Sequence, residues 1–267
     1  MKQPTWFFLA RDRAKVELKE FLRSREQMIF IFFFPVMLLV LFGAIFGDSD
    51  AGEGVTFGQY FLAGMIASGI MNTGFQSLAL SIATDRDTDV LKRLHGTPLP
   101  STAFFAGRLV QVLFVSVVQL VLLVGIGMLA YGVELPSTAA AWGTFLWVFL
   151  LGTAASVALG FGMSSLLRNA RTGSAVLTPV VLFLQFISGV FIVFTQVPPF
   201  LQSVASIFPL KWLAQGMRSV FLPPSFETAE ASGSWQHGAT AIVLTVWAVI
   251  GTIWAVRTFR WQRPEDR

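Results

Sequence analysis

The chain has 267 residues, of which 54% are hydrophobic and 13% are charged, and it contains no cysteine. A soluble domain has about 25% charged residues, so this composition favours a membrane protein, and the missing thiols exclude disulfides and zinc–thiolate sites. The formal net charge of +4 comes from basic residues spread over several loops, and a nucleic-acid-binding protein needs a basic face instead. We therefore expect no nucleic-acid partner. Because the two histidines, His95 and His237, lie far apart in the sequence, we also expect no metal site.

Residues 1–26 predict a cytoplasmic amphipathic helix at the membrane interface. Apolar side chains from Phe7 to Leu22 recur at three- and four-residue spacing, and most charged side chains fall on the other side. This pattern suits a helix that lies in the headgroup layer with its Lys and Arg near anionic lipid. The alternative is a solvated helix that only leads into the first membrane span.

Six apolar segments follow that are long enough to cross a bilayer, which takes about 20 residues. None contains Asp, Glu, Lys or Arg. Buried ionisable groups mark proton and ion pathways, so their absence weighs against a coupled secondary carrier. The predicted spans are 27–47, 58–83, 109–131, 142–167, 174–195 and 239–256.

The distribution of positive charge predicts the orientation of these spans. All but two of the 19 Lys and Arg residues lie on one side of the six-span map; the exceptions are Lys211 and Arg218. Short loops rich in Lys and Arg stay in the cytoplasm. We therefore expect a multi-pass protein of the plasma membrane with cytoplasmic N and C termini, the C-terminal tail being residues 259–267.

The loop between the second and third predicted spans carries the most specific pattern. It opens with three aspartates, where a helix N-terminus favours negative charge, and two basic residues follow one turn later. Gly96 and the prolines after it then end the helix. This predicts a short charged helix over residues 85–94 outside the membrane, which either docks into a partner or only closes a hairpin. The residues expected to dock are Asp85, Arg86, Asp87, Asp89, Lys92, Arg93 and Leu94.

The same loop resembles the signature of ABC transporter permeases of the second exporter class, which includes daunorubicin-resistance-type and polysaccharide-export permeases. Residues 85–87 match the acidic–Arg–acidic start of that signature, 91–94 match its middle and 97–99 its Thr-Pro-Leu close, whereas Asp89 stands where the family often has Gly. The resemblance covers essentially the whole chain. It implies that 85–94 is a coupling helix against a separate ATPase subunit present in two copies, that the permease pairs with a second copy of itself, and that both lie at a bacterial inner membrane.

ATP binding by this chain is not expected. A P-loop requires Gly-Lys-Ser/Thr at its end, and none of the five lysines follows a glycine. The chain is therefore expected to be no enzyme and to bind no cofactor itself, with ATP and Mg²⁺ held by the partner subunit.

Residues 198–222 predict an outer helical segment before the last span. After Pro209, the side chains of Lys211, Gln215 and Arg218 share one face of a helix. Such a helix either lies at the outer interface or re-enters the membrane, where irregular backbone must be buried in protein or line a cavity. It would serve as an exit gate, or as a packed lid whose Lys and Arg reach out to water.

Uncharged polar and aromatic residues of the second and fifth spans are candidates for a substrate pathway. They are Asn72, Gln76, Phe183, Gln185, Phe186 and Ser188. The alternative for the polar members is hydrogen bonding between helices, at about 1–2 kcal/mol or less per bond.

The sequence thus predicts an all-α membrane protein that exports an amphipathic drug-like or lipid-like compound by alternating access, driven by a separate ATPase. Two other functions remain open: export of a lipid-linked polysaccharide, and an ATP-independent channel or secondary carrier.

Overall fold

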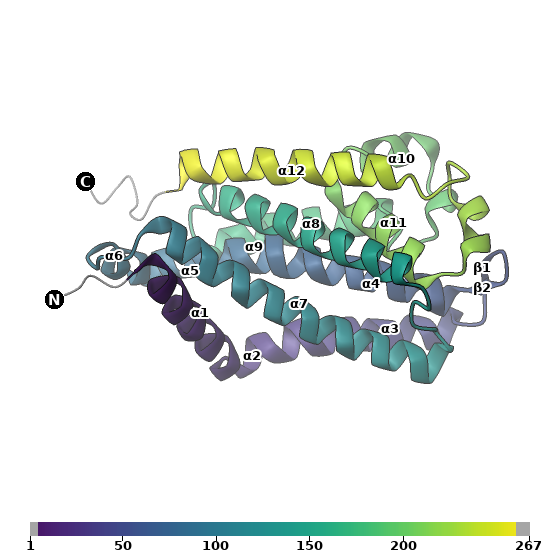
Figure 1. The fold of residues 1–267 in the computed structure, drawn as a ribbon, viewed down its shortest axis with the longest axis horizontal. Coiled ribbons are helices and arrows are strands. Elements are labelled where there is room, and N and C mark those ends of the chain that lie inside the picture. Colours follow the sequence, from purple (N-terminus) through teal and green to yellow (C-terminus); the bar gives the residue numbers. More distant parts are fainter. Residues whose placement is uncertain (1–4, 260–267) are drawn as a thin grey trace.

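Most of residues 5–259, the part of the chain that the computed structural model describes, is helical. The long helices run side by side along one axis, with α6 near one end of the bundle and the hairpin β1–β2 at the other (Figure 1). The α-helices are α1 (Trp6–Arg23), α2 (Arg25–Met28), α3 (Phe34–Phe46), α4 (Phe57–Met71), α5 (Leu78–Asp87), α6 (Val90–His95), α7 (Ser101–Tyr131), α8 (Ala139–Ser164), α9 (Ala170–Ile187), α10 (Pro199–Ala205), α11 (Pro209–Phe221) and α12 (His237–Thr258).

The remaining elements are short. The antiparallel hairpin pairs Asp50 with Thr56 and Gly52 with Val55. Two π-helical segments continue α2 into α3 and α4 into α5, and two 3₁₀ turns flank α10 and α11. These elements are β1 (Asp50–Gly52), β2 (Val55–Thr56), the π segments η1 (Ile29–Phe33) and η2 (Asn72–Ser77), and the 3₁₀ turns η3 (Phe194–Gln196) and η4 (Pro224–Ala229).

Within residues 5–259, five helices are long and apolar enough to cross a membrane. They contain or overlap the first, third, fourth, fifth and sixth predicted spans. The predicted second span, 58–83, is not among them, so six spans are not confirmed. Residues 58–83 belong to one helical run, Phe57–Asp87, in which the π segment η2 joins α4 to α5. The five helices are Arg25–Phe46, Ser101–Tyr131, Ala139–Ser164, Ala170–Ile187 and His237–Thr258.

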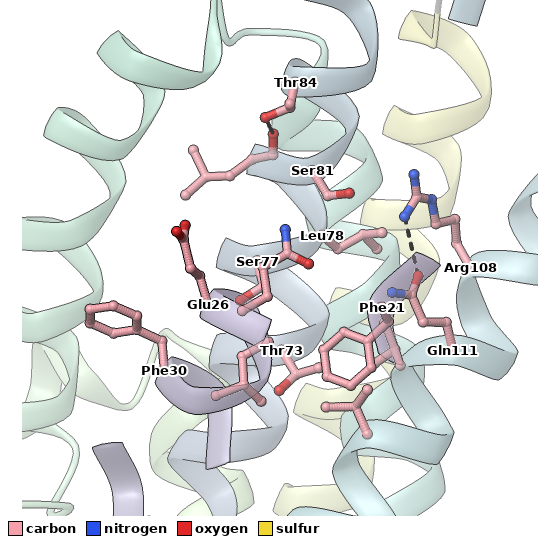
Figure 2. A pocket seen from close by; sticks show the side chains of 15 residues that line it. Phe21, Glu26, Phe30, Thr73, Ser77, Leu78, Ser81, Thr84, Arg108 and Gln111 are labelled. Atoms are coloured by element: carbon pink, nitrogen blue, oxygen red, sulfur yellow. Dashed lines mark hydrogen bonds between the residues drawn. The ribbon is translucent and has the colours of Figure 1, made fainter. Parts of the chain in front are cut away.

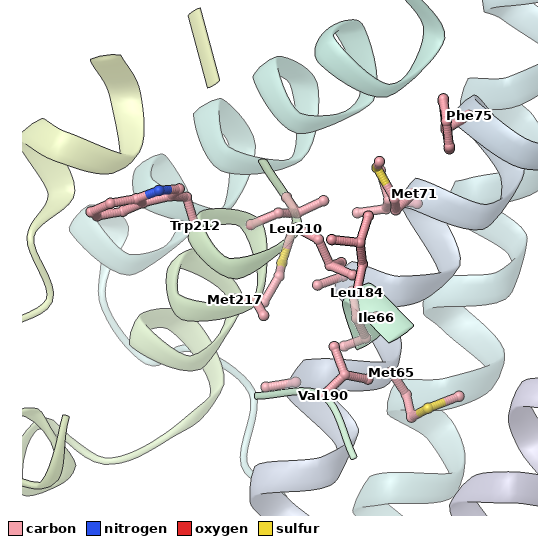
Figure 3. Packing of buried hydrophobic residues seen from close by; sticks show 14 of the residues in the cluster. Met65, Ile66, Met71, Phe75, Leu184, Val190, Leu210, Trp212 and Met217 are labelled. Atoms are coloured by element: carbon pink, nitrogen blue, oxygen red, sulfur yellow. The ribbon is translucent and has the colours of Figure 1, made fainter. Parts of the chain in front are cut away.

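The helix α4 forms the centre of the bundle. Its apolar side chains point in all directions and almost all of its residues are buried, as expected of a helix that has no solvent or lipid face. Met65 and Ile66 lie in one cluster with Leu184 of α9 and with Leu210 and Met217 of α11 (Figure 3). Helices within a membrane associate through van der Waals packing and interhelical hydrogen bonds, so the close packing of this cluster holds chain segments far apart in sequence around α4.

Close backbone contact fixes where α8 crosses the second helical run. A Cβ atom added to Gly160 of α8 would lie 2.3 Å from the backbone oxygen of Gly74 in η2. Real side chains do not approach that closely, so glycine at this position lets the two backbones touch. The crossing therefore depends on glycine at position 160.

Several predicted boundaries change. The fifth span was expected to reach residue 195, but α9 ends at Ile187, because Gly189 adopts a left-handed φ of 75° and turns the chain away. The third span was expected to start at 109, but α7 starts at Ser101. Arg108 therefore lies within the helix and not beyond its end.

The N-terminal helix is confirmed as a helix over Trp6–Arg23, and one of its faces packs on the rest of the protein. Phe7 and Leu22 of the expected apolar face are 67% and 52% exposed. The buried face, which packs on α7, contains two charged residues, Arg13 and Glu17. Of the predicted tail 259–267, all but Phe259 lies outside the described residues.

The predicted outer segment 198–222 consists of two helices, α10 and α11, separated before Pro209. α11 packs against α4, α8 and α12, and nearly all of its residues are buried. It therefore does not lie on the surface of this protein, and the idea that Lys211 and Arg218 reach out to water is wrong: they are 4% and 0% exposed.

Candidate functional site

The stretch predicted as one helix, 85–94, is divided into two. Asp85, Arg86 and Asp87 form the last turn of α5, and α6 starts at Val90. Between them Asp89 has a left-handed φ of 58°, a conformation that glycine adopts without cost and that Asp adopts more readily than most residues. The predicted single helix is therefore wrong, and the position of the break explains why glycine suits residue 89.

Asp85 belongs to a buried group of four charged residues, which we call the α1–α5–α7 cluster: Arg13, Glu17, Asp85 and Arg108. Arg108 Nη1 lies 2.7 Å from Glu17 Oε2, and Arg108 Nη2 pairs with Asp85 Oδ2. Arg13 pairs with Glu17 from the preceding turn of α1. All four side chains are less than a tenth exposed. Buried charges are retained only when paired, so the cluster fastens the N-terminal helix to α5 and α7.

The electrostatics of the cluster depend on its arginines. Burial raises the pKa of Glu17 and of Asp85 above their ordinary values, and the nearby guanidinium of Arg108 is the main influence that lowers both. Glu20, which is exposed at the edge of α1, adds a further increase in each pKa. Arg108, which lies between the two buried carboxyl groups, thus favours their charged forms and opposes the effect of burial.

The other two residues of the acidic–Arg–acidic pattern tie α5 to the connection between α8 and α9. Arg86 Nη1 donates hydrogen bonds to the backbone oxygens of Ser164 (3.0 Å) and Leu167 (3.3 Å), where α8 ends. Asp87 Oδ2 accepts one from the backbone N–H of Ala170 (2.9 Å), where α9 begins. A cation at a helix C-terminus and an anion at an N-terminus are both favourable. Their side chains are therefore engaged within this chain.

The helix α6 carries the exposed part of the predicted docking set. Leu91 is fully buried beneath it, whereas Asp89, Lys92 and Arg93 are exposed and Leu94 is half-buried. α6 lies at the tip of the bundle, beside the end of α5 (Figure 1). The structure thus presents two basic side chains on a short helix that is anchored by Leu91.

The polar residues predicted to line a pathway join helices to each other. Gln185 Nε2 of α9 donates to Ser68 Oγ (2.8 Å) and to Asn72 Oδ1 (3.2 Å). Gln76 Nε2 donates to Thr178 Oγ1 (3.0 Å). For these three residues the structure shows the interhelical alternative.

The remaining pathway candidates do not come together. Ser188 is fully buried, and its hydroxyl has no hydrogen-bond partner in the described part of the chain. Phe183 and Phe186 lie on the exposed side of α9, at 52% and 43% exposure. The six predicted residues therefore do not line one common cavity.

A pocket of about 360 Å³ lies elsewhere, between the α1–α2 elbow, the η2–α5 run and α7. Figure 2 shows Glu26 and Phe30 on one side of it and Arg108 and Gln111 on the other. Both π segments contribute to its wall, and such segments occur frequently at functional sites. Sequence reasoning missed this pocket, although hydroxyl residues at three- and four-residue spacing along one helix gave a signal. Those residues are Thr73, Ser77, Ser81 and Thr84.

The predicted outer gate forms fixed polar contacts at the opposite end of the bundle. Arg218 binds Glu230 through two hydrogen bonds, Nε to Oε1 at 2.6 Å and Nη2 to Oε2 at 3.1 Å, and its guanidinium carbon lies 4.9 Å from the ring centroid of Tyr60. Gln215 Nε2 donates to the backbone oxygen of Trp235 at 2.9 Å. Arg218 and Gln215 therefore hold α11 to the loop before α12.

Sequence reasoning missed Glu230 and Tyr60, and it placed Arg108 outside a helix. Among residues 5–259, no group of three or more His, Cys, Asp and Glu side chains could hold a metal ion. The charged groups thus act as ion-paired fasteners at both ends of the bundle, and the pocket beside η1 and η2 is the candidate for a ligand.

Comparison with known proteins identifies the family. The model of the ABC-2 type transporter family matches residues 14–222, from the middle of α1 to the end of α11. The inner membrane transport permease YadH of Escherichia coli K12 is 26% identical over 231 residues, which cover 81% of this chain and 84% of YadH. The daunorubicin resistance ABC transporter permease protein DrrB1 of Streptomyces coeruleorubidus is 26% identical over 258 residues, which cover 95% of this chain and 84% of DrrB1. The chain therefore belongs to the ABC-2 type transporter family, as a transmembrane permease subunit that implies an ABC ATPase partner.

Proposed function

We propose that this permease is the membrane part of an ATP-driven exporter that switches between inward and outward access when its ATPase partner closes. The observation that carries the proposal is the fastening of α6. Its neighbour α5 is bound through Asp85, Arg86 and Asp87 to α7, α8 and α9. A displacement of α6 is therefore passed to three long helices at once.

The docking surface in this proposal is α6 and not the whole stretch 85–94. Lys92 and Arg93 are exposed there and suit an acidic cleft of a partner, because complementary charge speeds and orients association. Asp89 sets the angle at which α6 leaves α5. Asp85, Arg86 and Asp87 pass the movement on and do not contact the ATPase.

We further propose that the pocket beside η1 and η2 receives an amphipathic, drug-like substrate. Its wall combines apolar side chains such as Phe30 and Val112 with the hydroxyls of Ser77 and Ser81. Ligand pockets are commonly lined by apolar groups with a few polar ones. The printed name of DrrB1 connects that relative with daunorubicin resistance. A lipid-linked polysaccharide is the second candidate substrate. The remaining candidate function is an ATP-independent channel or secondary carrier.

The proposed transporter has a defined membrane topology and subunit composition. We propose six membrane crossings, with residues 58–83 of the helical run Phe57–Asp87 as the second, because this stretch of helix is long enough and runs along the bundle with the others (Figure 1). Both termini would then lie in the cytoplasm, where short basic loops remain. Two copies of the permease and two of the ATPase complete the transporter in the plasma membrane, with ATP and Mg²⁺ on the ATPase. YadH, by its printed name, lies in an inner membrane.

The test is ATP turnover by the reconstituted permease–ATPase complex, with and without a candidate drug. The double variant Lys92→Glu and Arg93→Glu should abolish drug-stimulated turnover while the permease still inserts. The matched control is the same charge reversal at exposed Lys15 and Lys19 on α1, which should leave stimulation intact. If the α6 double variant behaves like the control, α6 is not the docking surface. Normal transport by the permease without any ATPase would refute the ATP-driven proposal altogether.

The pocket has its own test. Ser77→Leu places a larger apolar side chain in the pocket wall and should weaken drug stimulation without preventing assembly with the ATPase. Ser174→Leu, on α9 and outside this pocket, is the control. Equal drug stimulation of ATP turnover in both variants would show that the substrate does not bind in this pocket.

A further inference from the structure

A second cavity lies at the end of the bundle away from α6, between α10, α11 and residues 230–236. Its volume is about 300 Å³, and polar and apolar surfaces contribute about equally to its wall. Lys211 of α11 contributes to this wall and is 4% exposed. Lys15, Lys19 and Lys92, the other lysines that the structure describes, are exposed. Lys211 is therefore the one buried lysine within residues 5–259.

Lys211 has no carboxylate partner. Across the described residues, no ion pair or hydrogen bond reaches its ammonium group, which instead lies 3.5 Å from the ring centroid of Trp212 and 5.5 Å from that of Phe194. A cation–π contact of this kind stabilises a cation only weakly. Removal of an ammonium ion from water costs more than such contacts return, so the aromatic rings offset only part of the cost of burial.

The acid in the wall of the cavity is Glu230, and both of its oxygens are already bound by Arg218 at 2.6 and 3.1 Å. The pair Arg218–Glu230 is neutral as a unit, which leaves the positive charge of Lys211 in excess. Gln236 also lies in the wall, and its side-chain amide makes no hydrogen bond within the part of the chain described. The cavity thus holds a buried ammonium group without a direct ion pair and a side-chain amide without a hydrogen bond within the described residues.

We propose that this cavity binds an anionic group, a carboxylate or phosphate, with the Lys211 ammonium as its ion-pair partner and the Gln236 amide as a second donor. A bound anion neutralises the excess charge and gives Lys211 the charge-assisted hydrogen bond that the protein itself does not supply. The volume admits a small anion or the headgroup of an anionic lipid. The site is separate from the pocket beside η1 and η2, and its occupancy does not depend on transport.

The test measures how fast each lysine reacts with an amine-acylating reagent, peptide by peptide, in the full-length protein in phosphatidylcholine nanodiscs. Three additions are compared: inorganic phosphate, acetate, and phosphatidylglycerol in the disc. Acylation of Lys211 should slow severalfold with at least one of them, while that of Lys92 stays unchanged. Protection by the soluble ions identifies a free anion as the ligand. Protection by phosphatidylglycerol alone identifies a lipid headgroup.

Variants then assign the effect to Lys211. Lys211→Met should bind the protecting anion roughly tenfold more weakly or worse, the scale of one charge-assisted hydrogen bond, and Lys211→Arg should retain binding. Lys92→Met is the control of matched chemistry and should bind like the native protein. The proposal fails if no anion protects Lys211 in the native protein, a measurement that needs no variant to fold. It also fails if Lys211→Met and the native protein bind the anion equally.

Discussion

Replacement of Arg108 by Gln tests whether the α1–α5–α7 cluster holds the N-terminal helix in place. Arg108 pairs with Glu17 at 2.7 Å and with Asp85, and both carboxylates are buried. Removal of one partner from a buried ion pair costs about 3–5 kcal/mol, because a buried charge is left without compensation. Arg13 still pairs with Glu17, so the larger effect falls on Asp85. We expect Arg108→Gln to lower the free energy of unfolding by about 3–5 kcal/mol.

The loss should depend on pH in a defined direction. Burial raises the pKa of Glu17 and of Asp85, and Arg108 is the main influence that lowers them. Without Arg108 both pKa values rise further in the folded protein. A carboxyl group with a raised folded pKa stabilises the fold below its unfolded pKa, and this contribution is lost as the pH rises through the folded pKa. The defect of Arg108→Gln should therefore be smallest in acid and grow toward neutral pH.

The assay is denaturant unfolding in mixed detergent micelles, followed at several pH values. Arg11→Gln is the control, because its ion pair with Asp12 is at the surface, with side chains 48% and 64% exposed, and such pairs contribute about 0–1 kcal/mol. The double variant Arg108→Gln with Asp85→Asn should recover part of the loss. If Arg108→Gln costs no more than Arg11→Gln at neutral pH, the cluster does not stabilise this fold and the reasoning is wrong.

Two further substitutions probe the centre of the bundle by the same unfolding assay. Gly160→Ala should cost about 1–3 kcal/mol through overpacking, because the new Cβ would lie 2.3 Å from the backbone oxygen of Gly74. Gly125→Ala, in α7 with nothing within 4 Å of the added atom, should be neutral or stabilising; equal effects would contradict the close crossing of α8 and η2. Gln185→Leu removes the hydrogen bonds to Ser68 and Asn72 and should cost about 0.6–1.7 kcal/mol, and a loss above 3 kcal/mol would show that the contact is worth far more than other bonds of its kind.

Hydrophobicity alone predicted the helices that are apolar throughout their length. The sixth predicted span, 239–256, agrees with α12 (His237–Thr258) to within two residues at each end. Hydrophobicity could not predict the end of α9, because the sequence stays largely apolar through residues 188–195. The chain turns there because Gly189 is left-handed and because Tyr60, far away in sequence, accepts a hydrogen bond from the backbone of Phe194 at 3.0 Å.

Hydrophobicity also failed to predict that charged residues of the N-terminal helix are buried. The apolar spacing of the N-terminal helix indicated a face that runs from Phe7 to Leu22, but the buried face includes Arg13 and Glu17. Their partners on α5 and α7 are distant in sequence, and no local pattern identifies them. One local signal was present: Arg13 and Glu17 are opposite charges four residues apart, on the same side of the helix as Ala10 and Ala14.

The distribution of strong and weak contacts indicates which part of the bundle can rearrange during transport. Buried ion pairs fasten both ends, whereas uncharged hydrogen bonds join α9 to the second helical run in the middle. An ion pair of the first kind costs about 3–5 kcal/mol to break, and an uncharged bond in a membrane protein averages about 0.6 kcal/mol. If ATPase closure moves α6 in the proposed exporter, the ends move as units and the contact between α9 and η2 changes.

Cysteine crosslinking can test this division, because the chain contains no cysteine of its own. Ser68 and Gln185 are bonded at 2.8 Å in the middle of the bundle, and Trp6 and Thr102 are bonded at 2.9 Å at the end near α6. Cysteines at Ser68 and Gln185, joined by a short thiol reagent, should stop transport, and reduction should restore it. The same crosslink at Trp6 and Thr102 should be tolerated, since that end moves as a unit. Transport that continues with the middle pair crosslinked would mean that α9 and the end of α4 stay together, and the switch would then have to lie in another part of the fold.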